Sequence, residues 1–139
     1  SFWFVTDIAV LGISAAYVFG RIGNFFNQEL VGRVTDLPWG IYVGQTLRHP
    51  SQLYEAMLEG LLVFAILVYL RKRKTFDGQL ALMYGILYSF MRIVAEFFRH
   101  LYIQLGFIYS NWLTMGILQS SFVLVVCLGL YFKIRNMRK

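Results

Sequence analysis

Long apolar runs alternate with short polar segments along the whole chain. A bilayer core about 30 Å thick needs roughly 20 apolar residues per helix. Four segments fit this length: residues 2–19, 53–70, 79–98 and 111–132. The first of them carries a single charge, Asp7. The pattern predicts an all-α fold, a polytopic transmembrane helix bundle with about four spans in one membrane domain that covers residues 1–139.

Composition supports a membrane protein. Hydrophobic residues make up 58% of the chain and charged residues only 14%, whereas a soluble domain is about a quarter charged. The single cysteine, Cys127, excludes an intramolecular disulfide and a multi-cysteine metal centre. We expect Cys127 to pack as a small apolar residue. No residue spacing indicates a metal site, and we expect no cofactor.

The positive charge is concentrated at the ends of apolar runs. The formal net charge is +6, and eight of the 13 basic residues lie in two clusters: Arg71, Lys72, Arg73 and Lys74, and Lys133, Arg135, Arg138 and Lys139. This distribution follows the positive-inside rule and predicts that both clusters face the cytoplasm. The segment 20–52 then forms an outward loop. A nucleic-acid partner would require basic residues spread over a soluble surface, so we exclude one.

The segment 79–98 carries a polar stripe. At about 100° per residue, five side chains fall within an arc of about 120°: Tyr84, Tyr88, Arg92, Glu96 and Arg99. A charge at mid-bilayer costs roughly 2.5–3.5 kcal/mol, so the stripe must face other helices or a wet cavity. Arg92 and Glu96, one helical turn apart, can pair there. Such a pair either fixes helix packing or marks a functional site.

Two more polar segments follow the first apolar run. Residues 20–33 combine glycines with five polar side chains, namely Arg21, Asn24, Asn27, Glu29 and Arg33. Residues 48–55 read Arg-His-Pro-Ser-Gln-Leu-Tyr-Glu, in which Pro50 can open the next helix. His49 could titrate near neutral pH, although a lone interfacial histidine is more often structural.

Together, these three motifs resemble the bacterial prolipoprotein diacylglyceryl transferase family. The resemblance rests on Gly20-Arg21-Ile22-Gly23-Asn24-Phe25 through Gly32-Arg33, on Arg48 to Glu55, and on Tyr88…Arg92…Glu96-Phe97-Phe98-Arg99, in the family's order and spacing. It implies an enzyme of the bacterial inner membrane, with its site towards the outer face. That enzyme moves a diacylglyceryl group from phosphatidylglycerol to the lipobox cysteine of a prolipoprotein signal peptide, the first step of lipoprotein maturation.

The resemblance also implies site residues. Arg21, Asn24, Glu29 and Gly32 match functional loop positions, and Tyr88, Arg92 and Glu96 match functional helix positions. We hypothesise that Arg21 and Arg92 hold the phosphate, because guanidinium groups in a water-poor site stabilise charge on phosphate oxygens. Arg33 and His49 are further substrate-binding candidates.

One departure from the family pattern is the His-Gly-Gly motif, which this chain does not contain. We therefore expect more helices upstream and expect the present chain to be inactive by itself, with the general base outside it. The alternative function is a non-enzymatic membrane protein, a lipid-binding or transporter subunit whose polar stripe lines a passage.

Overall fold

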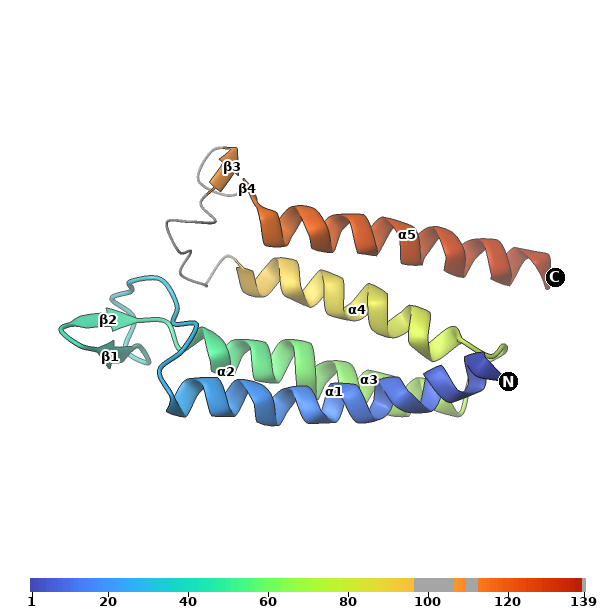
Figure 1. Ribbon diagram of the computed structural model, residues 1–139, viewed down its shortest axis with the longest axis horizontal. Coiled ribbons are helices and arrows are strands. Elements are labelled where there is room, and N and C mark those ends of the chain that lie inside the picture. The colour runs from blue at the N-terminus through green and yellow to red at the C-terminus, as the bar shows by residue number, and fades with distance from the viewer. Residues whose placement is uncertain (97–106, 110–112, 139) are drawn as a thin grey trace.

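The computed structural model describes residues 1–96, 107–109 and 113–138, and within these ranges it is a bundle of long helices (Figure 1). Helix α1 covers Phe2–Phe26. The next rod, Ser51–Arg71, consists of α2 (Ser51–Glu55), a π-helical stretch η1 (Ala56–Leu62) and α3 (Val63–Arg71). Helices α4 (Gln79–Glu96) and α5 (Met115–Met137) complete the bundle.

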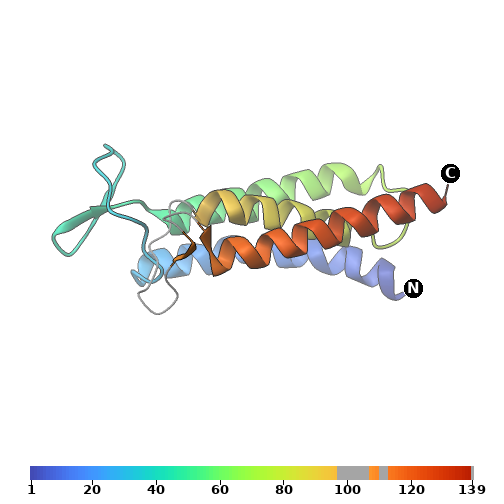
Figure 2. The same cartoon turned by 90° about the horizontal axis from the view of Figure 1, so that it is seen from above.

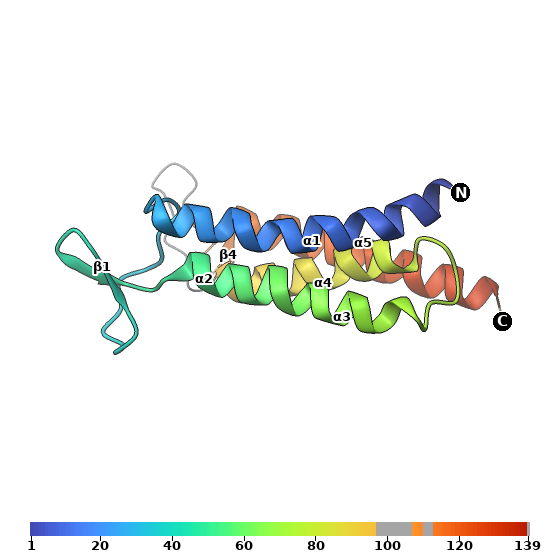
Figure 3. The ribbon, with the colours of Figure 1, turned by 90° about the horizontal axis from the view of Figure 1, so that it is seen from below.

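Two short hairpins lie at one end of this bundle. Strands β1 (Ile41–Val43) and β2 (Thr46–Arg48) pair antiparallel, with Tyr42 opposite Leu47. Gly44 makes the turn between them at φ 64°, a left-handed conformation that glycine adopts without strain. This hairpin projects beyond the helices, whereas both termini lie at the opposite end (Figures 1 and 3). Strands β3 (Phe107–Tyr109) and β4 (Leu113–Thr114) form the second pair, directly before α5.

The helices pack side by side, with α4 between the α1 and α2–α3 pair and the outer helix α5 (Figures 1 and 2). Val10, Val63, Leu67 and Leu80 form the buried apolar cluster between α1, α3 and α4. Glycines permit the closest helix contacts. A Cβ at Gly60 would lie 2.6 Å from Val18 Cγ2, and one at Gly85 would lie 2.6 Å from Cys127 Sγ.

The expected all-α membrane bundle is confirmed. Three helical rods of the described residues are long and apolar enough to cross a membrane: Phe2–Phe26, Ser51–Arg71 and Met115–Met137. Helix α4, which carries Arg92 and Glu96, lies beside them as the fourth rod. Cys127 is free and half-buried against α4, in agreement with its expected packing role. Residues 97, 98 and 99 of the predicted stripe segment lie outside the described residues.

The predicted start of the outward loop, residue 20, is wrong. Helix α1 continues to Phe26, so Arg21 and Asn24 lie on its last turns. Gly20 and Gly23 suggested a bend, but both remain helical, and a Cβ added at either would have open space around it. Each helical glycine costs about 0.5–1 kcal/mol. The ion pair and hydrogen bonds of Arg21, described below, offset this cost.

Asp7 organises the end of the bundle opposite the β1–β2 hairpin. Its buried carboxylate accepts hydrogen bonds from the backbone N–H groups of Gly78 (2.9 Å) and Ala81 (3.0 Å). These N–H groups belong to the first turn of α4, where a helix leaves donors unpaired. Lys74 Nζ also contacts Asp7 Oδ2 at 3.1 Å. A residue of α1 thus caps α4 and fixes the turn before it.

Candidate functional site

Two arginines from different helices meet at one buried carboxylate. Arg21 Nε, near the end of α1, lies 3.0 Å from Glu55 Oε2. Arg92 Nη1, on α4, lies 3.1 Å from Glu55 Oε1. Glu55 is fully buried, and the side chains of Arg21 and Arg92 are 17% and 11% exposed. A buried charge is tolerated only when it is paired, so Glu55 ties the two arginines together inside the bundle.

Two more glutamates surround Arg92. Glu59 Oε1 lies 3.5 Å from Arg92 Nη1, and Glu96 Oε2 lies 3.0 Å from Nη2. Tyr17 of α1 donates a hydrogen bond to Glu59 and accepts one from Arg21 Nε at 2.9 Å. Glu59 belongs to the π-helical stretch, a form frequent at functional sites. Arg21, Glu55, Glu59, Arg92 and Glu96 are called the ion-pair cluster below.

A chain of polar contacts extends the ion-pair cluster towards the end of α1. Arg21 Nη1 donates to Asn24 Oδ1 at 3.4 Å, and Asn24 Nδ2 donates to Glu29 Oε2 at 2.9 Å. Glu29 is exposed, and its carbonyl accepts a hydrogen bond from Gln52 Nε2 at 2.7 Å. Glu29 therefore reaches Arg21 through Asn24, whereas Glu96 contacts Arg92 directly.

An aromatic group borders the ion-pair cluster. The ring of Tyr88 lies edge-on to that of Tyr17, with centroids 5.6 Å apart, and stacks on that of Tyr84 at 5.7 Å. Tyr84, Tyr88, Arg92 and Glu96 of the predicted stripe thus face the neighbouring helices. Arg99 lies outside the described residues.

The other predicted positions lie around the base of the β1–β2 hairpin. The carbonyl of buried Gly32 accepts a hydrogen bond from Arg48 Nη1 at 3.1 Å, and the carbonyl of Arg33 accepts one from the His49 amide at 2.9 Å. His49 Nδ1 lies 3.1 Å from the Tyr54 hydroxyl, and its ring lines an apolar pocket of about 500 Å³ together with Trp39 and Leu53. These contacts place His49 beside the hairpin.

Glu55, Glu59 and Tyr17 were not among the predicted site residues, although they hold both arginines. Glu55 and Glu59 are spaced by four positions in an otherwise apolar segment, and carboxylates within a span are expensive unless they are partnered. Their spacing therefore indicates two carboxylates that need partners inside the bundle. Their partners, however, are on α1 and α4, so only the fold could reveal the contacts.

The ion-pair cluster combines three buried carboxylates with two guanidinium groups, a formal charge of −1 when all are ionised. Within the described residues, the terminal nitrogens of Arg21 make one hydrogen bond, the 3.4 Å contact with Asn24. Planar guanidinium groups recognise phosphate and carboxylate with paired hydrogen bonds. The arrangement can therefore bind an anion at Arg21 while the carboxylates fix the orientation of Arg92.

In the described part of the chain, no group of three or more His, Cys, Asp or Glu side chains is arranged to hold a metal ion.

The fold and the ion-pair cluster define a helical membrane protein with a charged site inside its bundle. Residues 1–133 match the family model described as prolipoprotein diacylglyceryl transferase, and the chain belongs to that family. Similar curated proteins carry the name phosphatidylglycerol–prolipoprotein diacylglyceryl transferase. The one from Aliarcobacter butzleri is 74% identical over 94% of this chain and 48% of its own length.

Two further relatives extend this comparison. The protein of Wolinella succinogenes is 53% identical over 94% of the chain and 47% of its own length. That of Campylobacter lari is 47% identical over 99% of the chain and 50% of its own length. The chain thus spans about half the length of the curated relatives that it matches.

Proposed function

We propose that the intact protein transfers the diacylglyceryl group of phosphatidylglycerol to the lipobox cysteine thiol of prolipoproteins. The observation that carries the proposal is the meeting of Arg21 and Arg92 at Glu55. The names of the relatives supply the two substrates, and the ion-pair cluster supplies groups suited to one of them, the phosphate of the lipid headgroup.

In this reaction the thiolate sulfur attacks the glyceryl carbon that carries the phosphate. A carbon–sulfur bond forms and the carbon–oxygen bond breaks, and its electron pair stays on the departing glycerol phosphate. The thiol proton passes to a base, which we place outside this chain. Negative charge grows on the phosphate oxygens as the bond breaks, and preorganised guanidinium groups stabilise that charge. Arg21 and Arg92 take this role.

The remaining residues position these groups. Glu55 and Glu96 fix the guanidinium plane of Arg92 from two sides, at 3.1 and 3.0 Å. Asn24, between Arg21 and Glu29, offers an amide to the headgroup. Tyr88 and Tyr17 cover one side of the site and exclude water, which strengthens every electrostatic contact there.

We also propose that the ion-pair cluster faces the outer side of the bacterial inner membrane. The basic residues 71–74 and Lys133, Arg135 and Arg138 gather at the opposite end of the bundle, where the turn 72–78 meets the end of α5. Basic residues mark the cytoplasmic side of membrane proteins. The β1–β2 hairpin then lies outside.

Arg92→Lys tests the role of the guanidinium in the full-length enzyme. The variant keeps the charge but loses the planar fork, so transfer of labelled diacylglyceryl to a lipobox peptide should fall by about 100-fold or more. Arg73→Lys, at the opposite end of the bundle, is the matched control and should retain activity. Normal turnover by Arg92→Lys in a correctly inserted protein would contradict the proposal. Lipid binding without thioether formation by the unaltered enzyme would support a non-enzymatic lipid carrier instead.

Asn24→Ala tests the amide beside Arg21. We expect slower transfer with nearly unchanged thermal stability, because Asn24 lies at the helix end and its loss leaves the Glu55 pairs intact. Unchanged kinetics would assign Asn24 a structural role only.

Single cysteines test the orientation. In a Cys127→Ser background, Gln45→Cys in the turn of the β1–β2 hairpin should react with a membrane-impermeant maleimide added to cells with a permeabilised outer membrane. Lys72→Cys should react only after the inner membrane is opened. The reverse pattern would overturn the orientation.

A further inference from the structure

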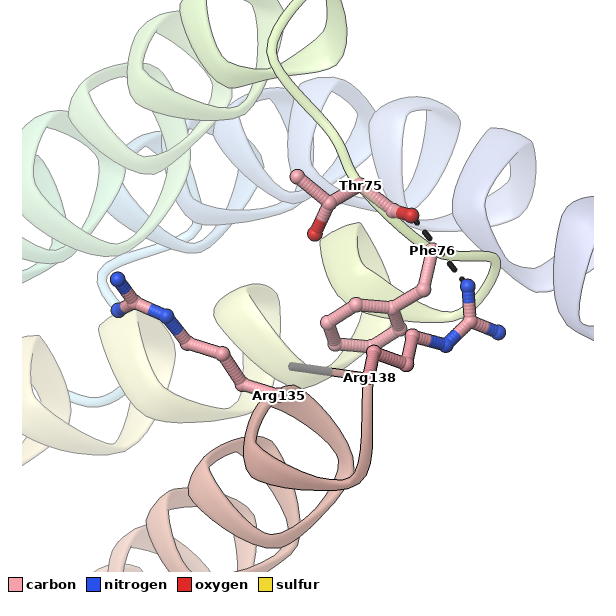
Figure 4. Close-up of a pocket in the computed structure, with 4 residues that line it drawn as sticks. All are labelled: Thr75, Phe76, Arg135 and Arg138. Carbon is pink, nitrogen blue, oxygen red and sulfur yellow. Dashed lines mark hydrogen bonds between the residues drawn. The ribbon is translucent and has the colours of Figure 1, made fainter.

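A pocket of about 540 Å³ lies at the end of the bundle opposite the ion-pair cluster. It is lined by Thr75 and Phe76 of the turn between α3 and α4 and by Arg135 and Arg138 at the end of α5 (Figure 4). The two arginines lie on either side of the Phe76 ring. The end of α5 thus supplies both arginines of this pocket, and the turn, far away in the sequence, supplies Thr75 and Phe76.

Arg138 is held in place by neutral partners. Its guanidinium lies 5.4 Å from the centre of the Phe76 ring, and Nη1 donates to the Thr75 carbonyl at 3.4 Å. Phe76 is buried and also packs on Tyr131, so the ring is a firm support. Stacking on an aromatic face orients a guanidinium without neutralising its charge.

Neither arginine of this pocket forms an ion pair with a carboxylate of the described residues. The two acidic side chains at this end are Asp7 and Asp77, and both are in contact with Lys74, at 3.1 and 2.9 Å. The charge of Arg138 also acts on Asp77, more weakly than that of Lys74. The pocket therefore keeps a surplus of positive charge, in contrast to the ion-pair cluster.

We propose that this pocket binds a phosphate group. Each guanidinium presents a fork of N–H donors that matches phosphate oxygens, and basic pockets between membrane helices on the cytoplasmic side bind lipid headgroups. The phosphate group can belong to a lipid headgroup or to free phosphate, and the surroundings of the pocket favour the lipid. Phe132 precedes Arg135 by about one helical turn and is 52% exposed, so it offers an apolar wall to an acyl chain whose headgroup lies in the pocket.

Photo-crosslinking tests the site without reference to the transferase reaction. Phe132 is replaced by p-benzoyl-L-phenylalanine in the intact protein, which is reconstituted in vesicles of phosphatidylglycerol and phosphatidylcholine. Mass spectrometry of the irradiated protein gives the ratio of the two lipids in the adduct. We expect phosphatidylglycerol to be enriched by about tenfold over its share of the vesicle, which corresponds to about 1.4 kcal/mol.

Variants with equal charge loss separate the pocket from the general basic surface. Arg135→Gln with Arg138→Gln should bring the adduct ratio to that of the bulk vesicle. Arg71→Gln with Lys72→Gln, which removes the same charge outside the pocket, should leave the enrichment within about twofold, because only the surface term changes. Bulk ratio in the parent protein, or equal loss in both double variants, would overturn the proposal.

Inorganic phosphate distinguishes the two sources. Added at millimolar concentration, it should leave the lipid enrichment unchanged if the acyl chains and headgroup bind together. Loss of enrichment, with sodium sulfate of equal ionic strength as the inactive control, would support a phosphate site that is filled from solution.

Discussion

The two ends of the bundle differ in how their arginine side chains are buried and paired. At the β1–β2 hairpin end, Arg21 and Arg92 are buried, and carboxylates from the Ser51–Arg71 rod and α4 contact them directly. At the other end, Arg135 and Arg138 are exposed, and Arg138 has an aromatic and a carbonyl partner. A buried charge must be paired because desolvation costs several kcal/mol per ion, whereas water and lipid headgroups satisfy an exposed one. Burial therefore separates an organised site from an open cationic surface.

The largest effect on stability is expected from a substitution at the β1–β2 hairpin end, where the charges are buried. Glu55→Ala removes the carboxylate shared by Arg21 and Arg92, and loss of one partner from a buried pair typically costs about 3–5 kcal/mol. The unfolding midpoint in detergent should fall sharply. Glu29→Ala, at an exposed carboxylate of the same end, should cost about 1 kcal/mol or less. Equal effects of the two variants would show that Glu55 does not stabilise the bundle.

Asp7 is the exception at the basic end, because it is buried there and bonds to two backbone amides. Asp7→Ala should destabilise the protein by about 1–2 kcal/mol, the usual cost of losing a helix cap. Hydrogen exchange should show faster exchange confined to the first turn of α4. Uniform acceleration over all helices would contradict a local capping role.

A smaller effect is expected from pH at the exposed pair Lys74–Asp77. The hydrogen bond from Lys74 lowers the pKa of the Asp77 carboxyl below its ordinary value. A group with a lowered folded-state pKa adds stability that is present above the ordinary carboxyl pKa and is lost as pH falls through the folded value. Thermal unfolding followed from pH 7 to below pH 4 should show a slightly shallower acid loss for Asp77→Asn than for the parent. An identical acid limb would exclude this contribution.

The smallest effect belongs to the open cationic surface. Arg71→Gln should change stability by no more than about 0.5 kcal/mol, as is usual for exposed positions. A loss as large as that of Asp7→Ala, measured in the same unfolding assay, would remove the distinction between the two ends.

The sequence anticipated the helices and part of the site because each depends on local signals. Apolar runs located the rods of the bundle, and the spacing of Arg92 and Glu96 located an ion pair within one helix. Contacts between helices had no such signal. Glu55 lies 34 positions after Arg21 in the sequence and on another helix, so its role as the shared carboxylate depended on how the helices pack.

Local signals also misled at the end of α1. Gly20 and Gly23 are residues typical of bends, yet the helix continues through both, and Arg21, which lies between them, pairs with Tyr17 and Glu55. Tertiary contacts thus outweighed local propensity. The π-helical stretch Ala56–Leu62 had no signal in the sequence, and its Gly60 packs closely against Val18 of α1.

The position of Gly116 has an electrostatic consequence for the buried carboxylate of Glu96. A Cβ at Gly116 would lie 3.0 Å from Glu96 Oε1, so the glycine lets Glu96 approach the backbone at the start of α5. The aligned peptide dipoles of a helix place about half a positive charge at its N-terminus. Helix α5 contributes neither Arg21 nor Arg92, but its N-terminus supplies a fractional counter-charge to Glu96 and so contributes to the charge balance of the ion-pair cluster through its backbone.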